Sequence, residues 1–176
     1  MTDDFPGGLA LRHPRVEDHA RVLAVLDQWW GGLGGETGSR ERALLLPRLY
    51  FQHFTGTSHV AERPSGELAA FLVGFLSQDR PDIAYIHFVG VDPALHGRGI
   101  ATALYHRFFA LARARHCRQV HAITSPANAA SRAFHTRIGF TELPGSPDAA
   151  PSVHPDYDGP GLDRVTFAHD LTAATG

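Results

Sequence analysis

Residues 83–101 read Ile-Ala-Tyr-Ile-His-Phe-Val-Gly-Val-Asp-Pro-Ala-Leu-His-Gly-Arg-Gly-Ile-Ala. The β-branched and aromatic residues of 83–91 predict a strand. Apolar residues recur at helical spacing from Gly99 to His116 and predict a helix. A glycine loop between a strand and a helix N-terminus favours anions, because its N–H groups and the helix dipole carry partial positive charge. The stretch therefore predicts a diphosphate site.

Two familiar phosphate-binding patterns do not fit this loop. The Walker pattern needs a lysine, and all 16 basic residues of this chain are arginines. The dinucleotide fingerprint needs glycine at position 102, where Thr102 stands, and an acid about 20 residues on. The first acid after the loop is Glu142. Both patterns are poor descriptions of the site.

The stretch instead resembles motif A of the GNAT N-acetyltransferases, Arg/Gln-x-x-Gly-x-Gly/Ala, which follows a strand ending in Val-x-Pro. A second family motif, Asn-x-x-Ala-x-x-Leu-Tyr-x-x-x-Gly-Phe, is similar to residues 128–140, Asn-Ala-Ala-Ser-Arg-Ala-Phe-His-Thr-Arg-Ile-Gly-Phe. The expected strands and helices also follow the family order from Leu9 to Asp170. The resemblance thus covers nearly the whole chain.

The resemblance implies an α/β fold formed by a single domain over residues 1–176. Its central sheet is mixed and mostly antiparallel, with about seven strands, splayed fourth and fifth strands, and about four flanking helices. From the sequence we expect strands at 9–12, 58–63, 67–77, 83–91, 119–124, 141–143 and 164–170. We expect helices from Pro14 onward, within 40–54, and at 99–116 and 128–138.

The resemblance also implies acetyl-CoA as co-substrate, with its pyrophosphate on residues 97–101. Backbone groups of residues 89–91 would hold the pantetheine arm, and the Val89 N–H would polarise the thioester carbonyl. Asn128 matches a family position that contacts this arm. The implied binding residues are Val89, Gly90, Val91, His96, Gly97, Arg98, Gly99, Ile100, Ala101 and Asn128.

Two positions depart from the family pattern. His96 stands where the family has Arg or Gln, and a histidine lacks the permanent charge and forked donors of arginine. His135 stands where many members carry the tyrosine that protonates the departing thiolate. An imidazole can also donate a proton, so His135 is a candidate acid. The alternative is that His135 only packs the last helix against the sheet.

Transfer to an amine also requires a base that deprotonates the ammonium form. Tyr85 and His87 share a strand face with Val89 and align with histidines that relay the amine proton in arylalkylamine acetyltransferases of the family. His87 is our first choice of base and Tyr85 the second. The alternative for His87 is a packed, hydrogen-bonded strand residue.

Two segments are candidates for the amine-binding pocket. Trp29 and Trp30 lie where the family places a loop over the acceptor, and they are either core residues or an aromatic wall of the pocket. Asp156, Tyr157 and Asp158 lie in a long loop before the final strand. These acids either belong to a solvated turn or attract a cationic amine. Together they favour a small, cationic, partly apolar acceptor.

Charge and composition restrict the remaining possibilities. The formal net charge is −2, yet residues 93–141 contain seven arginines and no acid, so this stretch is +7 and the remainder −9. The positive stretch suits an anionic partner such as the phosphates of acetyl-CoA. The single cysteine, Cys117, cannot form an internal bridge, and the histidines show no metal-ligand spacing, so we expect no metal.

Location and function follow from these patterns as expectations. The longest apolar run, 68–76, is too short to span a membrane, and the N-terminus lacks a signal-peptide pattern, so we expect a cytoplasmic protein. We expect an N-acetyltransferase that moves acetyl directly from acetyl-CoA to a small-molecule primary amine. Two alternatives are a non-catalytic acyl-CoA-binding sensor and a nucleic-acid-binding module. The spread of the arginines over helix, loop and strand argues against the latter, and a homodimer remains open.

Overall fold

The strands form a mixed sheet in the computed structural model, which describes residues 5–31 and 35–172. Backbone pairing follows the order β1-β2-β3-β4-β5-β8-β6, with β7 attached to β8. The pairs β1–β2, β2–β3, β5–β8, β6–β8 and β7–β8 are antiparallel, whereas β4 and β5 are parallel. The predicted mixed, mostly antiparallel sheet of an α/β fold is confirmed.

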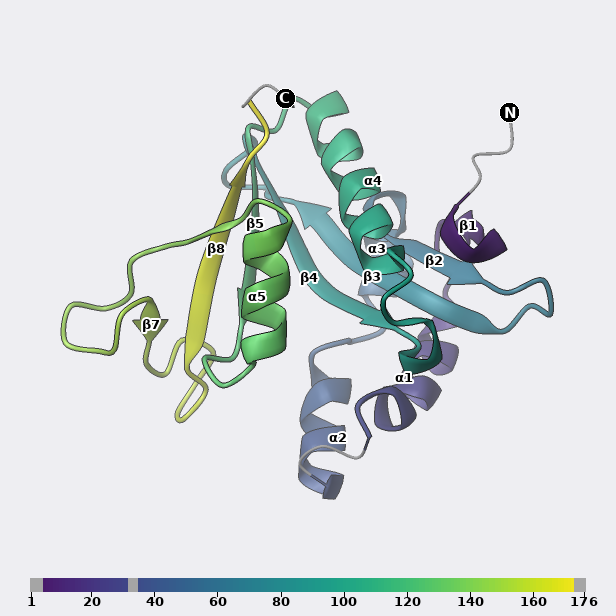
Figure 1. Ribbon diagram of the computed structural model, residues 1–176, viewed down its shortest axis with the longest axis horizontal. Helices are drawn as coiled ribbons and strands as arrows, with labels where there is room; N and C mark the ends of the chain where they lie inside the picture. The colour runs from purple at the N-terminus through teal and green to yellow at the C-terminus, as the bar shows by residue number, and fades with distance from the viewer. Residues whose placement is uncertain (1–4, 32–34, 173–176) are drawn as a thin grey trace. The chain divides into compact units, whose positions relative to one another are not determined.

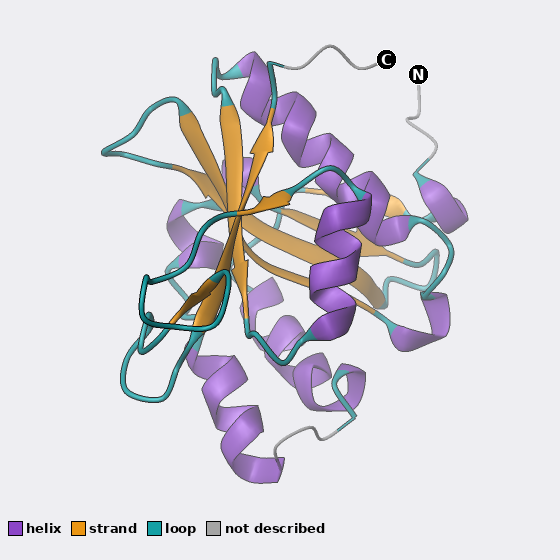
Figure 2. Ribbon diagram, turned by 60° about the vertical axis from the view of Figure 1, so that its left-hand side comes forward, coloured by secondary structure: helices purple, strands orange, loops and turns teal. Residues whose placement is uncertain are grey.

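The observed elements follow the expected order. The strands are β1 (Ala10–Arg12), β2 (His59–Glu62), β3 (Leu68–Leu76), β4 (Ile83–Val91), β5 (Gln119–Thr124), β6 (Thr141–Glu142), β7 (Val153–His154) and β8 (Arg164–Asp170). The helices are α1 (Asp18–Trp29), α2 (Gly35–Leu44), α3 (Tyr50–His53), α4 (Ile100–Ala114) and α5 (Ala129–Arg137). Figure 2 shows β7 as a short strand within the long loop that precedes β8.

Two expectations need correction. The first helix begins at Asp18 and not at Pro14, because residues 15–17 form a turn in which the Arg15 N–H donates to the Asp18 carboxylate. The described residues contain eight strands instead of about seven, since β7 pairs Val153 with Val165 and His154 with Arg164. Two residues in a loop rich in Pro, Gly and Asp carry no strand pattern of their own.

The chain divides into two compact units. The first contains residues up to Phe75 together with 86–111, and the second contains residues 76–85 and 112 onward. Strand β4 contributes residues 83–85 to the second unit and 86–91 to the first. The single-domain expectation remains a prediction.

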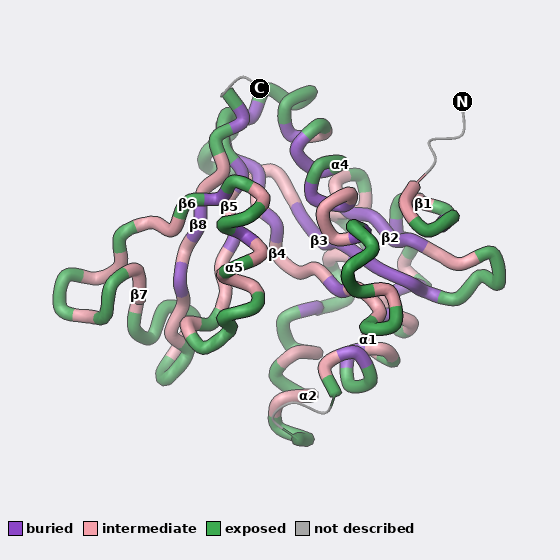
Figure 3. Tube along the Cα trace, viewed as in Figure 1, coloured by how far each residue is buried: buried purple, intermediate pink, exposed green. Residues whose placement is uncertain are grey.

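The core of the first unit lies between α1 and strands β2 and β3. Its buried members include Val22 and Leu26 from α1, Val60 from β2, and Phe71 and Val73 from β3. Strand β3 is buried over most of its length, whereas the turn that joins it to β2 is exposed (Figure 3). Helix α1 therefore lies on the sheet through one apolar face, and this fixes the frame that carries β4.

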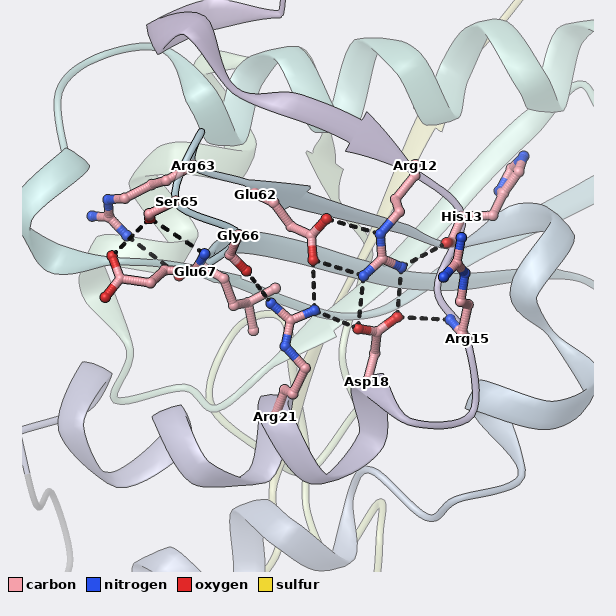
Figure 4. Close-up of polar contacts among 11 residues, drawn as sticks. Arg12, His13, Arg15, Asp18, Arg21, Glu62, Arg63, Ser65, Gly66 and Glu67 are labelled. Atoms are coloured by element: carbon pink, nitrogen blue, oxygen red, sulfur yellow. Dashed lines mark hydrogen bonds and ion pairs between the residues drawn. The ribbon is translucent and has the colours of Figure 1, made fainter.

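An ion cluster joins the start of α1 to β1 and β2 (Figure 4). Arg12 donates to Asp18 at 2.6 Å and to Glu62 at 2.7 Å, and Arg21 donates to the same two carboxylates at 2.7 and 2.6 Å. Burial alone raises the pKa of Asp18, but hydrogen bonds from Arg12, the Arg15 N–H and Arg21 lower it to about 2. Two arginines thus neutralise two carboxylates at this side of the sheet.

Candidate active site

The end of β4 and the loop after it form one backbone path in the first unit. The Asp92 N–H donates to the Ala69 carbonyl of β3 at 2.9 Å, so β4 is held against β3 up to the point where the loop starts. Gly90 lies directly over the Phe71 ring, where a Cβ atom would come within 2.4 Å of Phe71 Cε1. Only glycine lets the two strands approach at this point.

Asp92 fixes the start of the loop. Its side chain accepts from the Ala94 N–H at 2.8 Å and from Arg63 Nη2 at 2.8 Å. Desolvation raises the pKa of Asp92, but these two hydrogen bonds outweigh it and lower the pKa below its ordinary value. His96 Nε2 lies 3.1 Å from the carbonyl oxygen of Val91. The histidine that replaces the family's Arg or Gln therefore folds back onto the end of β4.

The glycine loop presents unused donors. Gly97 and Gly99 both have φ of +76°, a conformation that L side chains rarely adopt, and a Cβ on either would meet no atom within 4 Å. Residues 97–102 donate no backbone N–H to another group in the described part of the chain. Ile100 is buried and anchors the first turn of α4. The loop is thus anchored at Ile100 and open toward solvent, which suits an anion.

His87 is held by the segment that connects α2 with α3. Its Nε2 makes a short hydrogen bond with the carbonyl oxygen of Leu45, and its ring stacks on Tyr50 with centroids 4.6 Å apart. The side chain is half-buried. The sequence offered no signal for Tyr50 or for the Leu45 carbonyl, because both lie about 40 residues before His87.

The two tryptophans have different surroundings. Trp29 is buried and stacks on Phe71 at 6.0 Å, so it belongs to the core of the first unit. Trp30 is half-buried, and its ring lies 5.5 Å from that of Phe88. Phe88 follows His87 in β4, so Trp30 is the tryptophan with exposed surface beside the strand that carries the proposed base.

Tyr85 lies in the second unit, at the last register pair of β4 with β5. The pairs are Ile83 with Gln119, Ala84 with Val120, and Tyr85 with His121. Strand β4 continues to Val91 and β5 continues to Thr124 beyond this pair. Tyr85 is half-buried at this position.

His135 and Asn128 belong to α5 and its cap, which lie alongside β8 (Figure 1). Asn128 is exposed, and its side-chain oxygen accepts from the Ser131 N–H at 3.0 Å. His135 is only 4% exposed; its ring stacks on Phe167 at 4.7 Å and meets Phe140 edge-on at 5.1 Å. Burial lowers its pKa, although the hydrogen bond to the Ser131 carbonyl opposes this. His135 is therefore a neutral, packed ring.

The acids of the long loop take part in its local structure. Asp156 has φ of +52° and accepts from the Gly161 N–H at 2.6 Å. Asp158 forms an ion pair with Arg164 at 2.7 Å. Tyr157 is half-exposed and lies 5.7 Å from His154. Asp158 is thus already neutralised by an arginine, whereas Asp156 shapes the turn.

The described residues contain neither a metal-binding cluster nor a membrane-spanning helix. Within residues 5–31 and 35–172, no group of three or more His, Cys, Asp and Glu side chains could hold a metal ion. No helix in the same ranges has the length and apolarity needed to cross a membrane. The buried Cys117 thiol lies 3.6 Å from the Pro81 carbonyl oxygen, and burial raises its pKa, which disfavours the nucleophilic thiolate.

The fold is α/β with a mixed sheet, and a glycine loop with unused N–H groups follows its fourth strand at the start of α4. Residues 23–140 match the model of the acetyltransferase (GNAT) family. This match covers more than half of the chain, and the protein belongs to that family.

Three relatives share the description L-2,4-diaminobutyric acid acetyltransferase. The protein from Nocardia farcinica is 30% identical over 163 residues, which cover 91% of this chain and 80% of that protein. The protein from Streptomyces anulatus is 35% identical over 102 residues, or 54% of this chain and 51% of the relative. The chain spans a similar share, 56%, of the relative from Bordetella parapertussis.

Solved structures share the fold at lower identity. Diaminobutyrate acetyltransferase EctA from Paenibacillus lautus, in complex with L-2,4-diaminobutyric acid and coenzyme A, has a TM-score of 0.63 at 20% identity and covers 96% of this chain and 98% of its own. A phosphinothricin acetyltransferase from Sinorhizobium meliloti, in complex with acetyl-CoA, has a TM-score of 0.65 at 19% identity and covers 99% of this chain and 91% of its own. At this identity the likeness supports the fold alone.

Proposed function

We propose that this protein is an N-acetyltransferase that moves the acetyl group of acetyl-CoA directly to a primary amine of a small molecule. One observation carries the proposal: residues 97–102 present unused N–H groups at the N-terminus of a fifteen-residue helix in a family of acetyltransferases. Such a cradle stabilises the negative charge of a diphosphate. Acetyl-CoA supplies the activated acetyl group as a thioester.

The residues around the loop fit this co-substrate. Gly97 and Gly99 leave the space above the loop open, so a phosphate can approach the backbone closely. His96 stays on the end of β4 and leaves the N–H groups uncovered. Backbone groups of Val89, Gly90 and Val91 are proposed to hold the pantetheine arm. Asn128 uses its side-chain oxygen to cap α5, and its amide N–H groups are a further proposed contact for the cofactor.

His87 is the proposed base, and Tyr85 is the second candidate on the same strand. A primary amine is mainly protonated at neutral pH, and its nitrogen attacks a carbonyl only after it has lost one proton. The amine N–H bond breaks, a bond from this proton to the imidazole forms, and His87 becomes a cation. A histidine suits this step, because its ordinary pKa lies near neutral pH.

His135 is a candidate acid for the departing thiolate, with packing of the last helix as the alternative role. Its ring is packed between Phe140 and Phe167 and keeps its pKa low through burial, which supports the packing alternative. Replacement of His135 by phenylalanine separates the two roles.

The first acceptor to test is L-2,4-diaminobutyrate, the compound in the names of the relatives. It is a small cationic amine, the class that the tryptophans and acids favoured in the sequence. Trp30 offers partly exposed aromatic surface, and Asp156 is proposed to add negative charge. We also propose a cytoplasmic location, where the acetyl-CoA pool is available.

The test is calorimetric titration with acetyl-CoA, with NADH as the control ligand. Gly99→Arg should abolish micromolar binding, because the new side chain fills the open space above the loop. Gly66→Arg is the matched control: Gly66 also has a positive φ, +85°, and open surroundings, but lies in the β2–β3 turn. Equal loss in both variants, or no binding by the parent protein, would contradict the proposal.

Activity is then measured as thiol release with L-2,4-diaminobutyrate and other small amines. Turnover that requires both acetyl-CoA and an amine is the expected result. Binding of acetyl-CoA without turnover of any amine would instead favour the non-catalytic sensor.

A further inference from the structure

The contact between His87 and Leu45 determines where the imidazole carries its proton. A backbone carbonyl oxygen only accepts hydrogen bonds, so Nε2 of His87 must be the donor in this contact. A neutral imidazole has one N–H, and its other nitrogen holds the basic lone pair. With Nε2 protonated, the lone pair lies on Nδ1.

Tyr50 holds the ring in this orientation. The two rings stack with 24° between their planes. Tyr50 also belongs to an aromatic cluster, because its ring centroid lies 5.3 Å from that of Phe54 and 6.3 Å from that of Phe75. Burial raises the pKa of Tyr50, so its phenol remains neutral. A neutral, half-buried ring of this kind restricts rotation of the imidazole without competing for its proton.

From these contacts we infer that His87 is locked as the Nε2–H tautomer by the Leu45 carbonyl, that Nδ1 is the nitrogen that takes the proton of the amine, and that Tyr50 is a positioning residue for this step. The inference rests on the proposed function for the role of Nδ1, but the tautomer itself does not.

The proton balance is complete within these groups. One N–H bond of the substrate ammonium breaks, a Nδ1–H bond forms, and the ring becomes an imidazolium. Its Nε2–H remains on the Leu45 carbonyl, where the hydrogen bond becomes charge-assisted and therefore stronger. The carbonyl thus stabilises the charged product of the proton transfer as well as the tautomer that starts it.

The first test is spectroscopic and needs no activity. Protein labelled with ¹⁵N at histidine is examined near pH 8 by long-range ¹H–¹⁵N correlation, and His87→Gln identifies the signals that belong to His87. The expected pattern places the proton on Nε2 and leaves Nδ1 unprotonated. An Nδ1–H tautomer, or an averaged mixture, would overturn the inference even if the protein proves to be an active acetyltransferase.

The second test separates positioning from packing. Tyr50→Leu should lower kcat about tenfold or more, in the range of general-base contributions, while acetyl-CoA affinity stays unchanged. It should also convert the His87 signal into a mixture of tautomers. Tyr50→Phe keeps the stacked ring and should restore both readouts.

Phe51→Leu is the matched control. Phe51 neighbours Tyr50 in α3 and is 2% exposed, but its ring lies against that of His19, with centroids 5.4 Å apart. It should lower the melting temperature and leave the tautomer and kcat of the folded enzyme unchanged. An unaltered tautomer and kcat in Tyr50→Leu would refute the positioning role. If no amine is turned over, the proposed function fails, and the tautomer pattern still decides this inference.

Discussion

Phe71 occupies the space that any side chain at position 90 would need. An ideal Cβ on Gly90 lies 2.4 Å from Phe71 Cε1 and 2.7 Å from Phe71 Cζ, and the Phe71 ring itself stacks with the rings of Trp29 and Phe88. The contact lies beside the proposed oxyanion donor Val89. It therefore links the core of the first unit to the backbone on which the acetyl group would be held.

Gly90→Ala should destabilise the protein by about 1–3 kcal/mol, the usual cost of overpacking a core. Contacts with the Trp29 and Phe88 rings restrict any movement of the Phe71 ring away from the new methyl group. Chemical denaturation measures the effect. Gly56→Ala is the control, since Gly56 has no positive φ and its Cβ would meet no atom within 4 Å. Phe71→Leu in the Gly90→Ala background should recover part of the loss, and no recovery would contradict the steric explanation.

Asp18 should make the protein acid-sensitive in a defined pH range. Its folded pKa of about 2 lies below the ordinary 3.8, so its stabilisation is fully present above about pH 4 and is lost as the pH falls toward 2. The shift corresponds to about 2 kcal/mol. Asp18→Asn should lower the free energy of unfolding at pH 7 and flatten its dependence on pH in this range. The exposed Asp79→Asn should change neither quantity.

His59 should produce a second loss of stability at higher pH. It is 6% exposed, and burial, with smaller effects of His13 and Arg107, lowers its pKa from 6.5 to about 4. Between about pH 6.5 and 4, His59 is protonated in the unfolded chain but neutral in the folded protein. The free energy of unfolding therefore falls by about 3 kcal/mol as the pH drops through this range. His59→Leu should remove this slope, as followed by urea unfolding. A slope that persists in this variant but disappears in the exposed His53→Gln would show that the assignment is wrong.

His135→Phe distinguishes packing from acid catalysis. A phenyl ring keeps the stack on Phe167 but loses the hydrogen bond to the Ser131 carbonyl, which costs about 1 kcal/mol in the melting experiment. If His135 only packs, kcat per folded molecule stays within about twofold of the parent. A loss of tenfold or more would restore the role as acid that the family resemblance implies.

Local sequence determined the elements and the glycine loop. These features are local: the alternation of 83–91, the helical spacing after Gly99 and the paired glycines. Each depends on residues that are close together in the sequence, so each can be recognised without knowledge of the tertiary structure. The seven expected strands all occur, and the missing eighth, β7, is two residues long and is formed by pairing with β8. Position 90 also needs glycine, but the reason, the Phe71 ring, lies about 20 residues away.

Only the tertiary structure decided the surroundings of the candidate acid–base groups. The alternation of the strand places His87 and Phe88 on opposite faces. His87 contacts Tyr50 and Phe88 contacts Trp30, yet both of these aromatic side chains pack against the same core. His135 became a buried neutral ring because Phe140 and Phe167 enclose it. Periodicity and motifs report the conformation of neighbouring residues, whereas the proton positions and pKa values of these histidines depend on partners brought together by folding.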